Sequence, residues 1–159
     1  MSEDIRIKND KFSFHYRVAG LIEQNGKFLI QKIDGYDYYI LPGGHVKLGE
    51  SSKAAIRREI LEEVGFNIQL SKLFCVHENF YMKNGVLEHF IENYFLINPV
   101  GELKINNWSV QENDDGRIFN YNFYWLSIDE IKNIDLKPTA IKELIINNKY
   151  NDFNYLIKE

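Results

Sequence analysis

Three glutamates near the middle of the chain, Glu59, Glu62 and Glu63, have a spacing that suits the binding of a divalent cation. They are separated by steps of three and four residues, so a helix would carry all three on one side. Like charges at these spacings disfavour a helix by roughly 0.2–0.5 kcal/mol per pair, and Arg58 can balance only part of that repulsion. Because carboxylate oxygens are the ligands that Mg²⁺ and Mn²⁺ prefer, the pattern indicates a metal-binding face.

The segment before these glutamates favours a site over a solvated surface. A group of glutamates on a helix is more often a solvated face, and the acidic residues alone do not exclude that interpretation. Here they follow a turn that contains Gly43 and Gly44. Two glycines permit backbone conformations closed to other residues and let main-chain groups approach a ligand closely. The turn and the carboxylates together therefore predict a ligand site.

The composition indicates a single globular domain over residues 1–159. A hydrophobic content of 45% with 14% aromatic residues is typical of a packed core. The net charge is −4 and no stripe of Lys and Arg is present, which argues against polymeric DNA or RNA as a partner. The single cysteine, Cys75, excludes an internal disulfide and lies in an apolar stretch typical of a buried thiol.

The sequence also lacks the signals of membrane insertion. The first ten residues contain no apolar segment of signal-peptide length, and no later apolar run approaches the ~20 residues of a membrane span. We therefore expect no membrane partner and a cytoplasmic location. Whether the protein forms a homodimer is left open.

The pattern of turns and apolar residues predicts alternating strands and helices. Asn25-Gly26 and Asn84-Gly85 each lie between apolar runs and predict hairpins. The predicted elements are two strands within 12–33, a short extended piece at 38–41, a helix at 51–64, strands at 66–82 and 87–97, a loop at 99–116, a strand at 119–126, a helix start at 127–130 and a final helix at 138–148.

The helix at 51–64 is predicted to pack through one apolar stripe, which leaves its acidic face available. The residues of that stripe are Ala54, Ala55, Ile56, Ile60, Leu61 and Val64. Ser51 suits the first turn and Gly65 suits the residue that ends the helix. Strands before and after a central helix favour an α/β or α+β fold with a mixed sheet and helices on its faces.

The run from Gly44 to Phe66 resembles the Nudix box, G-x5-E-x7-R-E-U-x-E-E-x-G-U, in which U is a bulky aliphatic residue. Every fixed position is present: Gly44, Glu50, Arg58, Glu59, Glu62, Glu63 and Gly65. Ile60 fills the first U, and Phe66 places an aromatic residue at the last. Residues 39–44 and 125–130 are similar to two further family segments, with Tyr39 where the family often has Trp.

This resemblance implies a Nudix α/β/α sandwich with a central mixed sheet, formed by one Nudix hydrolase domain. It also implies metal-dependent hydrolysis of a nucleoside diphosphate linked to another group, with Mg²⁺ or Mn²⁺ as cofactor and a small nucleotide as substrate. Nucleoside triphosphates, ADP-ribose and nucleotide sugars all fit that description. The alternative is a Nudix-fold sensor that binds a nucleotide without turnover; such domains commonly lose box glutamates, whereas this chain keeps them.

The resemblance assigns roles to several side chains. The metal ligands it implies are the main-chain carbonyl of Gly44 and the carboxylates of Glu59, Glu62 and Glu63. Arg58, fixed by Glu50, is expected to orient a box glutamate. The catalytic base is either a box glutamate, which favours Glu59, or a carboxylate from a distant loop. For the second case the candidates are Glu112 and, behind it, Glu88 and Glu92.

The residues that bind the nucleobase are less constrained by the sequence. Tyr39, Tyr81 and Trp125 are the candidates, although an aromatic residue in a strand is more often part of the core. Tyr81 follows the box by 15 residues, near the place where dinucleoside polyphosphate hydrolases of the family carry a tyrosine. His45 lies inside the box and is expected near the site.

Overall fold

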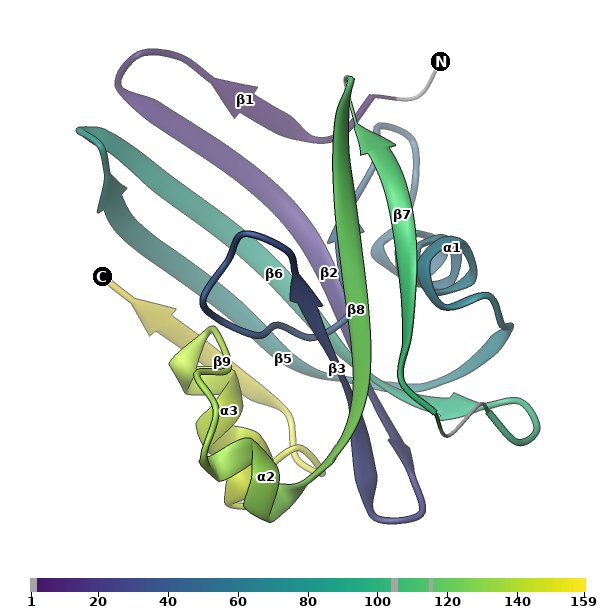
Figure 1. The fold of residues 1–159 in the computed structure, drawn as a ribbon. Helices are drawn as coiled ribbons and strands as arrows, with labels where there is room; N and C mark the ends of the chain where they lie inside the picture. The colour runs from purple at the N-terminus through teal and green to yellow at the C-terminus, as the bar shows by residue number, and fades with distance from the viewer. Residues whose placement is uncertain (1–2, 104–105, 115) are drawn as a thin grey trace.

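The computed structural model describes residues 3–103, 106–114 and 116–159, and Figure 1 shows their strands at the centre with helices on either side. In chain order the elements are β1 (Arg6–Lys8), β2 (Phe12–Gln24), β3 (Lys27–Ile33), β4 (Gly43–His45), α1 (Ser52–Val64), β5 (Ile68–Lys83), β6 (Val86–Pro99), β7 (Trp108–Asp114), β8 (Arg117–Ser127), α2 (Ile128–Lys132), α3 (Thr139–Ile146) and β9 (Asn154–Lys158).

Both predicted hairpins are confirmed, and their turns explain why the strands reverse there. Asn25 and Gly26 have φ angles of 53° and 74°, and Asn84 and Gly85 have φ angles of 51° and 80°. Positive φ at both central residues is the type I′ pattern, whose twist matches that of the flanking strands. The first turn joins β2 to β3, and the second joins β5 to β6.

The strands form one mixed sheet that separates into two halves. Their order is β7-β8-β3-β2-β6-β5-β9, with β1 and β4 paired to β2. The pairs β2–β6 and β5–β9 are parallel, and the remaining pairs are antiparallel. Within the described residues, β2 and β3 pair through Glu23–Phe28 and Gln24–Lys27 alone, beside their turn. Beyond that point β3, β8 and β7 diverge from the half that contains β2, β6, β5 and β9.

Apolar cores on both faces of the sheet confirm the predicted sandwich. On one face, Ala55 and Ile56 of α1 pack with Val18 of β2 and Phe123 of β8. On the other face, α2 and α3 pack against residues of β2, β3, β5 and β6. Figure 1 shows α1 on the side of β7 and β8, and α2 and α3 beside β9. The architecture is therefore a mixed α+β fold with helices on two sides of a central sheet.

The prediction of a loop at 99–116 was wrong where β7 lies; residues 104, 105 and 115 of that range lie outside the described residues. β7 pairs with β8 and has no second neighbour among the described strands. Its polar side chains bond across the ladder, for example Ser109 Oγ to Asn122 Oδ1 at 2.7 Å and Gln111 Nε2 to Asn120 Oδ1 at 3.0 Å. β7 was missed because it is an edge strand with polar side chains on its exposed face, so its sequence lacks the alternation of apolar residues by which strands are predicted.

The predicted packing of α1 needs correction, and two short strands were missed. Ala54 is exposed and Leu61 is 48% exposed, so the apolar stripe of α1 is narrower than predicted and is centred on Ala55, Ile56 and Ile60. The short strands β1 and β9 were not predicted, since each pairs along one side and is exposed over much of its length.

Cys75 is buried, as expected. No helix in the described part of the chain is long and apolar enough to cross a membrane.

Candidate active site

Caps at both ends of α1 set the position of the acidic residues. Ser51 accepts a hydrogen bond from the Ala54 backbone N–H at 3.2 Å and so starts the helix. Gly65 ends it with φ = 82°, and its N–H donates to the carbonyls of Ile60 and Leu61. Arg58, Glu59, Glu62 and Glu63 are consequently held on α1 against the glycine turn.

The glycines of that turn are required by close contacts. β4 pairs with β2, with Gly43 opposite Ala19 and Gly44 opposite Val18. A Cβ at Gly43 would lie 2.1 Å from the Val18 carbonyl oxygen, and a Cβ at Gly44 would lie 2.4 Å from the Glu59 carboxylate. Neither position has room for a side chain. The turn therefore brings its backbone against a box glutamate, and the Gly43 N–H donates to Glu63 Oε2 at 3.2 Å.

Arg58 links the loop to the helix through five hydrogen bonds. Its Nε and Nη2 donate to the two oxygens of Glu50, at 2.9 Å each, and Nη2 also donates to the His45 carbonyl at 3.0 Å. Its Nη1 donates to Glu59 Oε1 at 2.6 Å and to Glu62 Oε2 at 3.2 Å. The bidentate bond to Glu50 lowers the pKa of that carboxyl and raises the pKa of Arg58.

The protein does not fully compensate the ionised forms of the two inner glutamates of the site, Glu59 and Glu63. Glu63 is 7% exposed, and burial together with Glu59 raises its pKa to about 8. Burial also raises the pKa of Glu59, with the Arg58 hydrogen bond acting in the opposite direction. In the described part of the chain, no three His, Cys, Asp or Glu side chains form a ready-made metal cluster. Glu59 and Glu62 are instead turned toward Arg58.

These side chains face a cleft of about 310 Å³ between α1 and the β7–β8 half of the sheet. The cleft brings together most of the predicted site residues: Gly44, Arg58, Glu59, Glu62, Glu63 and Glu112. Glu50 does not line the cleft and contacts it through Arg58. Further lining residues are Arg17, Gln31, His45 and Tyr121. Glu112 is supplied by β7; burial first and the Glu112 carboxylate second raise the pKa of Tyr121 on the neighbouring strand β8. A carboxylate from a segment distant in sequence thus faces the box glutamates.

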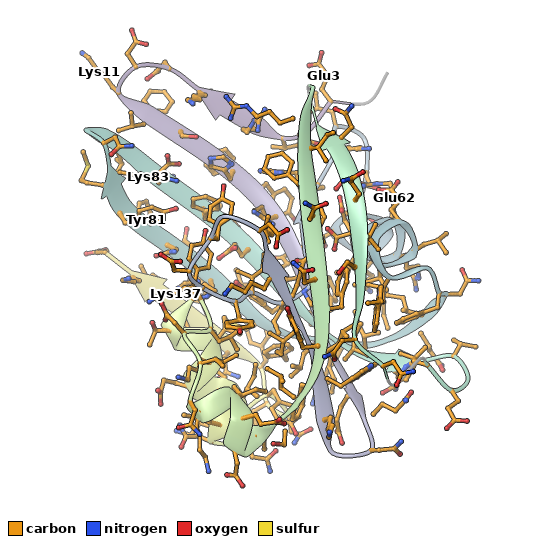
Figure 2. The ribbon with its side chains drawn as sticks, viewed as in Figure 1. Glu3, Lys11, Glu62, Tyr81, Lys83 and Lys137 are labelled. Carbon is orange, nitrogen blue, oxygen red and sulfur yellow. The ribbon has the colours of Figure 1, made fainter. Side chains whose placement is uncertain are left out.

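The other predicted residues lie away from this cleft. Glu88 is 3.3 Å from His15 Nε2, and Glu92 belongs to a second cleft together with Tyr81. Tyr39 packs edge-on against Tyr124 and joins the core under α2 and α3. Trp125 is 7% exposed and belongs to the core under α1. Figure 2 shows Glu62 on the α1 side of the molecule and Tyr81 on the β5 side. The positions of Tyr39 and Trp125 favour packing roles.

Sequence reasoning missed Arg17, which lines both clefts. It is partly buried on β2, and no ion pair with a carboxylate is recorded for it among the described residues. Burial first and Arg17 second lower the pKa of His45 to about 3, so that imidazole is neutral at pH 7. The available signal was a cation directly before the apolar run of residues 18–22, inside a segment predicted to be a strand. A guanidinium that pairs with no carboxylate of the described residues suits an anionic ligand.

Comparison with known proteins agrees with the geometry. The NUDIX domain family model matches residues 13–145. An 8-oxo-dGTP diphosphatase from Buchnera aphidicola is 30% identical over 122 residues, which cover 72% of this chain and 78% of the relative. The nucleoside triphosphatase NudI from Klebsiella pneumoniae is 30% identical over 136 residues, which cover 77% of this chain and 89% of the relative.

A solved structure shares the fold. A MutT protein from Bacillus halodurans superposes with a TM-score of 0.66 at 15% identity, covering 89% of this chain and 86% of that protein. The resemblance inferred from the box is confirmed, because the family model spans well over half of the sequence. This chain belongs to the Nudix hydrolase family.

Proposed function

We propose that this protein is a metal-dependent hydrolase that cleaves the diphosphate linkage of a nucleoside diphosphate joined to another group, by attack of water at phosphorus. The observation that carries the proposal is the cleft itself, which is lined by the box carboxylates Glu59, Glu62 and Glu63. The cation Arg17 lines the same cleft and has no ion pair among the described residues. Hydrolysis of a diphosphate requires its negative charge to be neutralised and a water molecule to be positioned. The carboxylates suit a metal ion, and Arg17 suits a phosphate.

The donor set fits Mg²⁺ or Mn²⁺. Glu59, Glu62, Glu63 and the main-chain carbonyl of Gly44 would hold the ion. The raised pKa of buried Glu63 means that its charged form lacks compensation in the protein, and a divalent cation would supply it. Arg58 donates to one oxygen of Glu59 and one oxygen of Glu62. Metal binding would require both carboxylates to turn away from Arg58. When bound, the ion would polarise a phosphoryl oxygen and lower the pKa of a bound water.

The remaining residues have distinct roles in the proposal. Arg58, held by both oxygens of Glu50, positions Glu59, and Arg17 binds the diphosphate. Two carboxylates can act as the base. Glu59 is close to the glycine turn but is bonded to Arg58, whereas Glu112 reaches the same cleft from β7. The geometry favours Glu112, since its carboxylate is separate from the ligand set.

Replacement of Arg17 by Met is expected to raise KM about tenfold with a smaller fall in kcat. A charge-assisted contact to phosphate is worth about 1.5–3 kcal/mol, and about 1.4 kcal/mol corresponds to a factor of ten. Steady-state kinetics on the preferred substrate measure the change. The matched control is Arg57→Met, because Arg57 is an exposed arginine on α1 whose side chain contacts the Lys53 carbonyl at 3.4 Å. Equal KM values for the two variants would remove Arg17 from the site.

The substrate is proposed to be a small nucleotide, with nucleoside triphosphates tested first, because the two relatives above are named for them. ADP-ribose and nucleotide sugars follow. The test is a panel of nucleoside triphosphates, ADP-ribose, nucleotide sugars and dinucleoside polyphosphates, each incubated with the protein in Mg²⁺ and in EDTA. We expect release of phosphate or pyrophosphate products from at least one member in Mg²⁺ and none in EDTA. Binding without release for every member would instead establish a non-catalytic sensor.

A further inference from the structure

A second cleft of about 390 Å³ lies next to the candidate active site. It shares Arg17 and Ile40 with the first cleft, so a ligand can extend from one into the other. Its distinctive lining residues are three aromatic side chains and three lysines: Tyr38, Tyr81, Phe90, Lys83, Lys137 and Lys158. Figure 2 shows Tyr81, Lys83 and Lys137 on the same side of the molecule, beside β5 and β9. None of these residues belongs to the Nudix box.

The strand register explains why these residues gather on one face. Phe90 of β6 is opposite Asn79 of β5, which is opposite Lys158 of β9. Tyr81 and Lys83 follow Asn79 on β5 at intervals of two, and side chains two apart in a strand point to the same face. The floor of the cleft is therefore a continuous row across three strands. Such a floor is rigid, because each member is fixed by a hydrogen-bonded ladder.

The aromatic part of the floor is a stack of rings in which Tyr81 is the exposed member. The rings of Tyr81 and Phe90 are nearly parallel, with 7° between their planes and 5.9 Å between centroids. The Phe90 ring is in turn parallel to His15, at 4.3 Å and 5°. Tyr81 is 39% exposed, so part of its ring is available to a ligand. A planar group, such as a nucleobase, can extend this stack on the exposed part of Tyr81.

The charged part of the cleft has a surplus of cations in a chain whose net charge is −4. Lys137 has a partner, since its Nζ lies 3.0 Å from Asp135 Oδ1. For Lys83 and Lys158, no ion pair is recorded in the described part of the chain. The single carboxylate in the lining, Glu92, accepts a hydrogen bond from the Tyr94 hydroxyl at 3.0 Å. Two lysines therefore remain to meet an anion.

In the described part of the chain, a buried acceptor in the lining of this cleft, on Asn79, also lacks a partner. Asn79 Oδ1 is buried and has no hydrogen-bond partner among the described residues. His77, two residues earlier on β5, is fully buried and does not line the cleft, and its ring nitrogens also have no hydrogen-bond partner there. His77 Nδ1 lies 3.5 Å from Glu92 Oε2, at the limit of a useful contact. An unsatisfied buried acceptor is costly, and a ligand donor would relieve that cost. This observation is independent of the lysines and points to the same cleft.

We propose that the second cleft binds the arm of the substrate that is not attacked, and that this arm carries both an aromatic ring and a phosphate outside the cleaved diphosphate. The inference rests on the proposed function for the position of the diphosphate, which Arg17 holds between the clefts. The ring stacks on Tyr81 with a donor directed at Asn79, and the further phosphate is bound by Lys83 and Lys158. This assigns a substrate class, a nucleotide with an additional phosphate, that the box does not specify.

The test compares paired nucleotides in EDTA by isothermal titration calorimetry, so the readout does not depend on turnover. Each pair consists of a nucleoside 5′-monophosphate and its 3′,5′-bisphosphate, with adenine, guanine, cytosine and uracil. For at least one base we expect the bisphosphate to bind about tenfold more tightly. Lys83→Ala/Lys158→Ala is expected to abolish that advantage, and Tyr81→Ala to weaken both members of the pair.

The matched control is Lys11→Ala/Lys53→Ala, which removes the same charge from exposed positions that line neither cleft. Equal affinity within every pair, or the same loss of advantage in the control, would overturn the inference. Thermal unfolding of each variant separates a binding defect from a folding defect. A protein that hydrolyses the substrate panel but fails this test retains its proposed function, whereas one that passes here without hydrolysis has lost it.

Discussion

Glu63→Gln is expected to reduce kcat by about 10³-fold in saturating Mg²⁺ and, in EDTA, to make the protein more stable than the wild type. A bound metal contributes several kcal/mol to a phosphoryl-transfer reaction, and each 1.4 kcal/mol is a factor of ten. The stability gain follows from burial: Glu63 is 7% exposed and lies near Glu59, whereas an amide keeps an oxygen for the Gly43 N–H without the charge. Chemical denaturation with EDTA present measures the second effect.

The pH dependence of that stability has a defined sign. Burial raises the pKa of Glu63 from 4.5 to about 8, so between these values the folded protein holds a proton that the unfolded chain has lost. Wild-type stability in EDTA should therefore fall as pH rises from about 4.5 to 8, by up to about 1.4 kcal/mol per pH unit from this group. Glu63→Gln should lack this contribution.

Glu62→Gln is the matched control for the stability effect. Glu62 is on the same helix and in the proposed ligand set, but its side chain is 51% exposed. We expect a comparable loss of activity with little change in stability or in its pH slope. If Glu63→Gln lowers the free energy of unfolding of the metal-free protein, and the loss of kcat follows from that unfolding, the carboxylate is a structural element and its assignment as a ligand fails.

Glu112→Gln is expected to lower kcat about 10²-fold while leaving KM nearly unchanged. A general base typically contributes 10²- to 10⁴-fold, and an amide cannot take a proton from water. The acid limb of the kcat profile should flatten in the variant. Glu102→Gln, an exposed carboxylate outside the active-site cleft, serves as the control. An unchanged kcat in saturating Mg²⁺ would leave Glu59 as the remaining candidate.

The elements that could be predicted from sequence are those with strong local determinants. Asn25-Gly26 and Asn84-Gly85 specify hairpins through positive φ, and Ser51 and Gly65 bound α1 through its caps. The contact of Arg58 with Glu50 was also expected, since both positions belong to the box. Each of these features depends on residues close together in the chain.

What could not be predicted depends on pairing between distant segments. β7 is stabilised by its ladder to β8, and no apolar pattern marks it in the sequence. Arg17 meets the box because β4 pairs with β2, which places His45 opposite Arg17. Tyr39 and Trp125 were candidates for stacking on a nucleobase because they are aromatic, but tertiary packing places them in the cores. Composition cannot distinguish an aromatic residue in a core from one in a cleft.

Because β3 diverges from β2 beyond their shared turn, the proposed catalytic residues are held by two different halves of the sheet. The proposed metal ligands are anchored to the half that contains β2 and β4, whereas Glu112 is anchored to β7, in the half built from β3 and β8. The proposed base and the proposed metal ligands therefore belong to different halves of the sheet, whose strands β2 and β3 pair through Glu23–Phe28 and Gln24–Lys27. We expect substitutions that displace β7 relative to α1 to lower kcat with little change in metal affinity, because the proposed ligands and the proposed base are held by different strands.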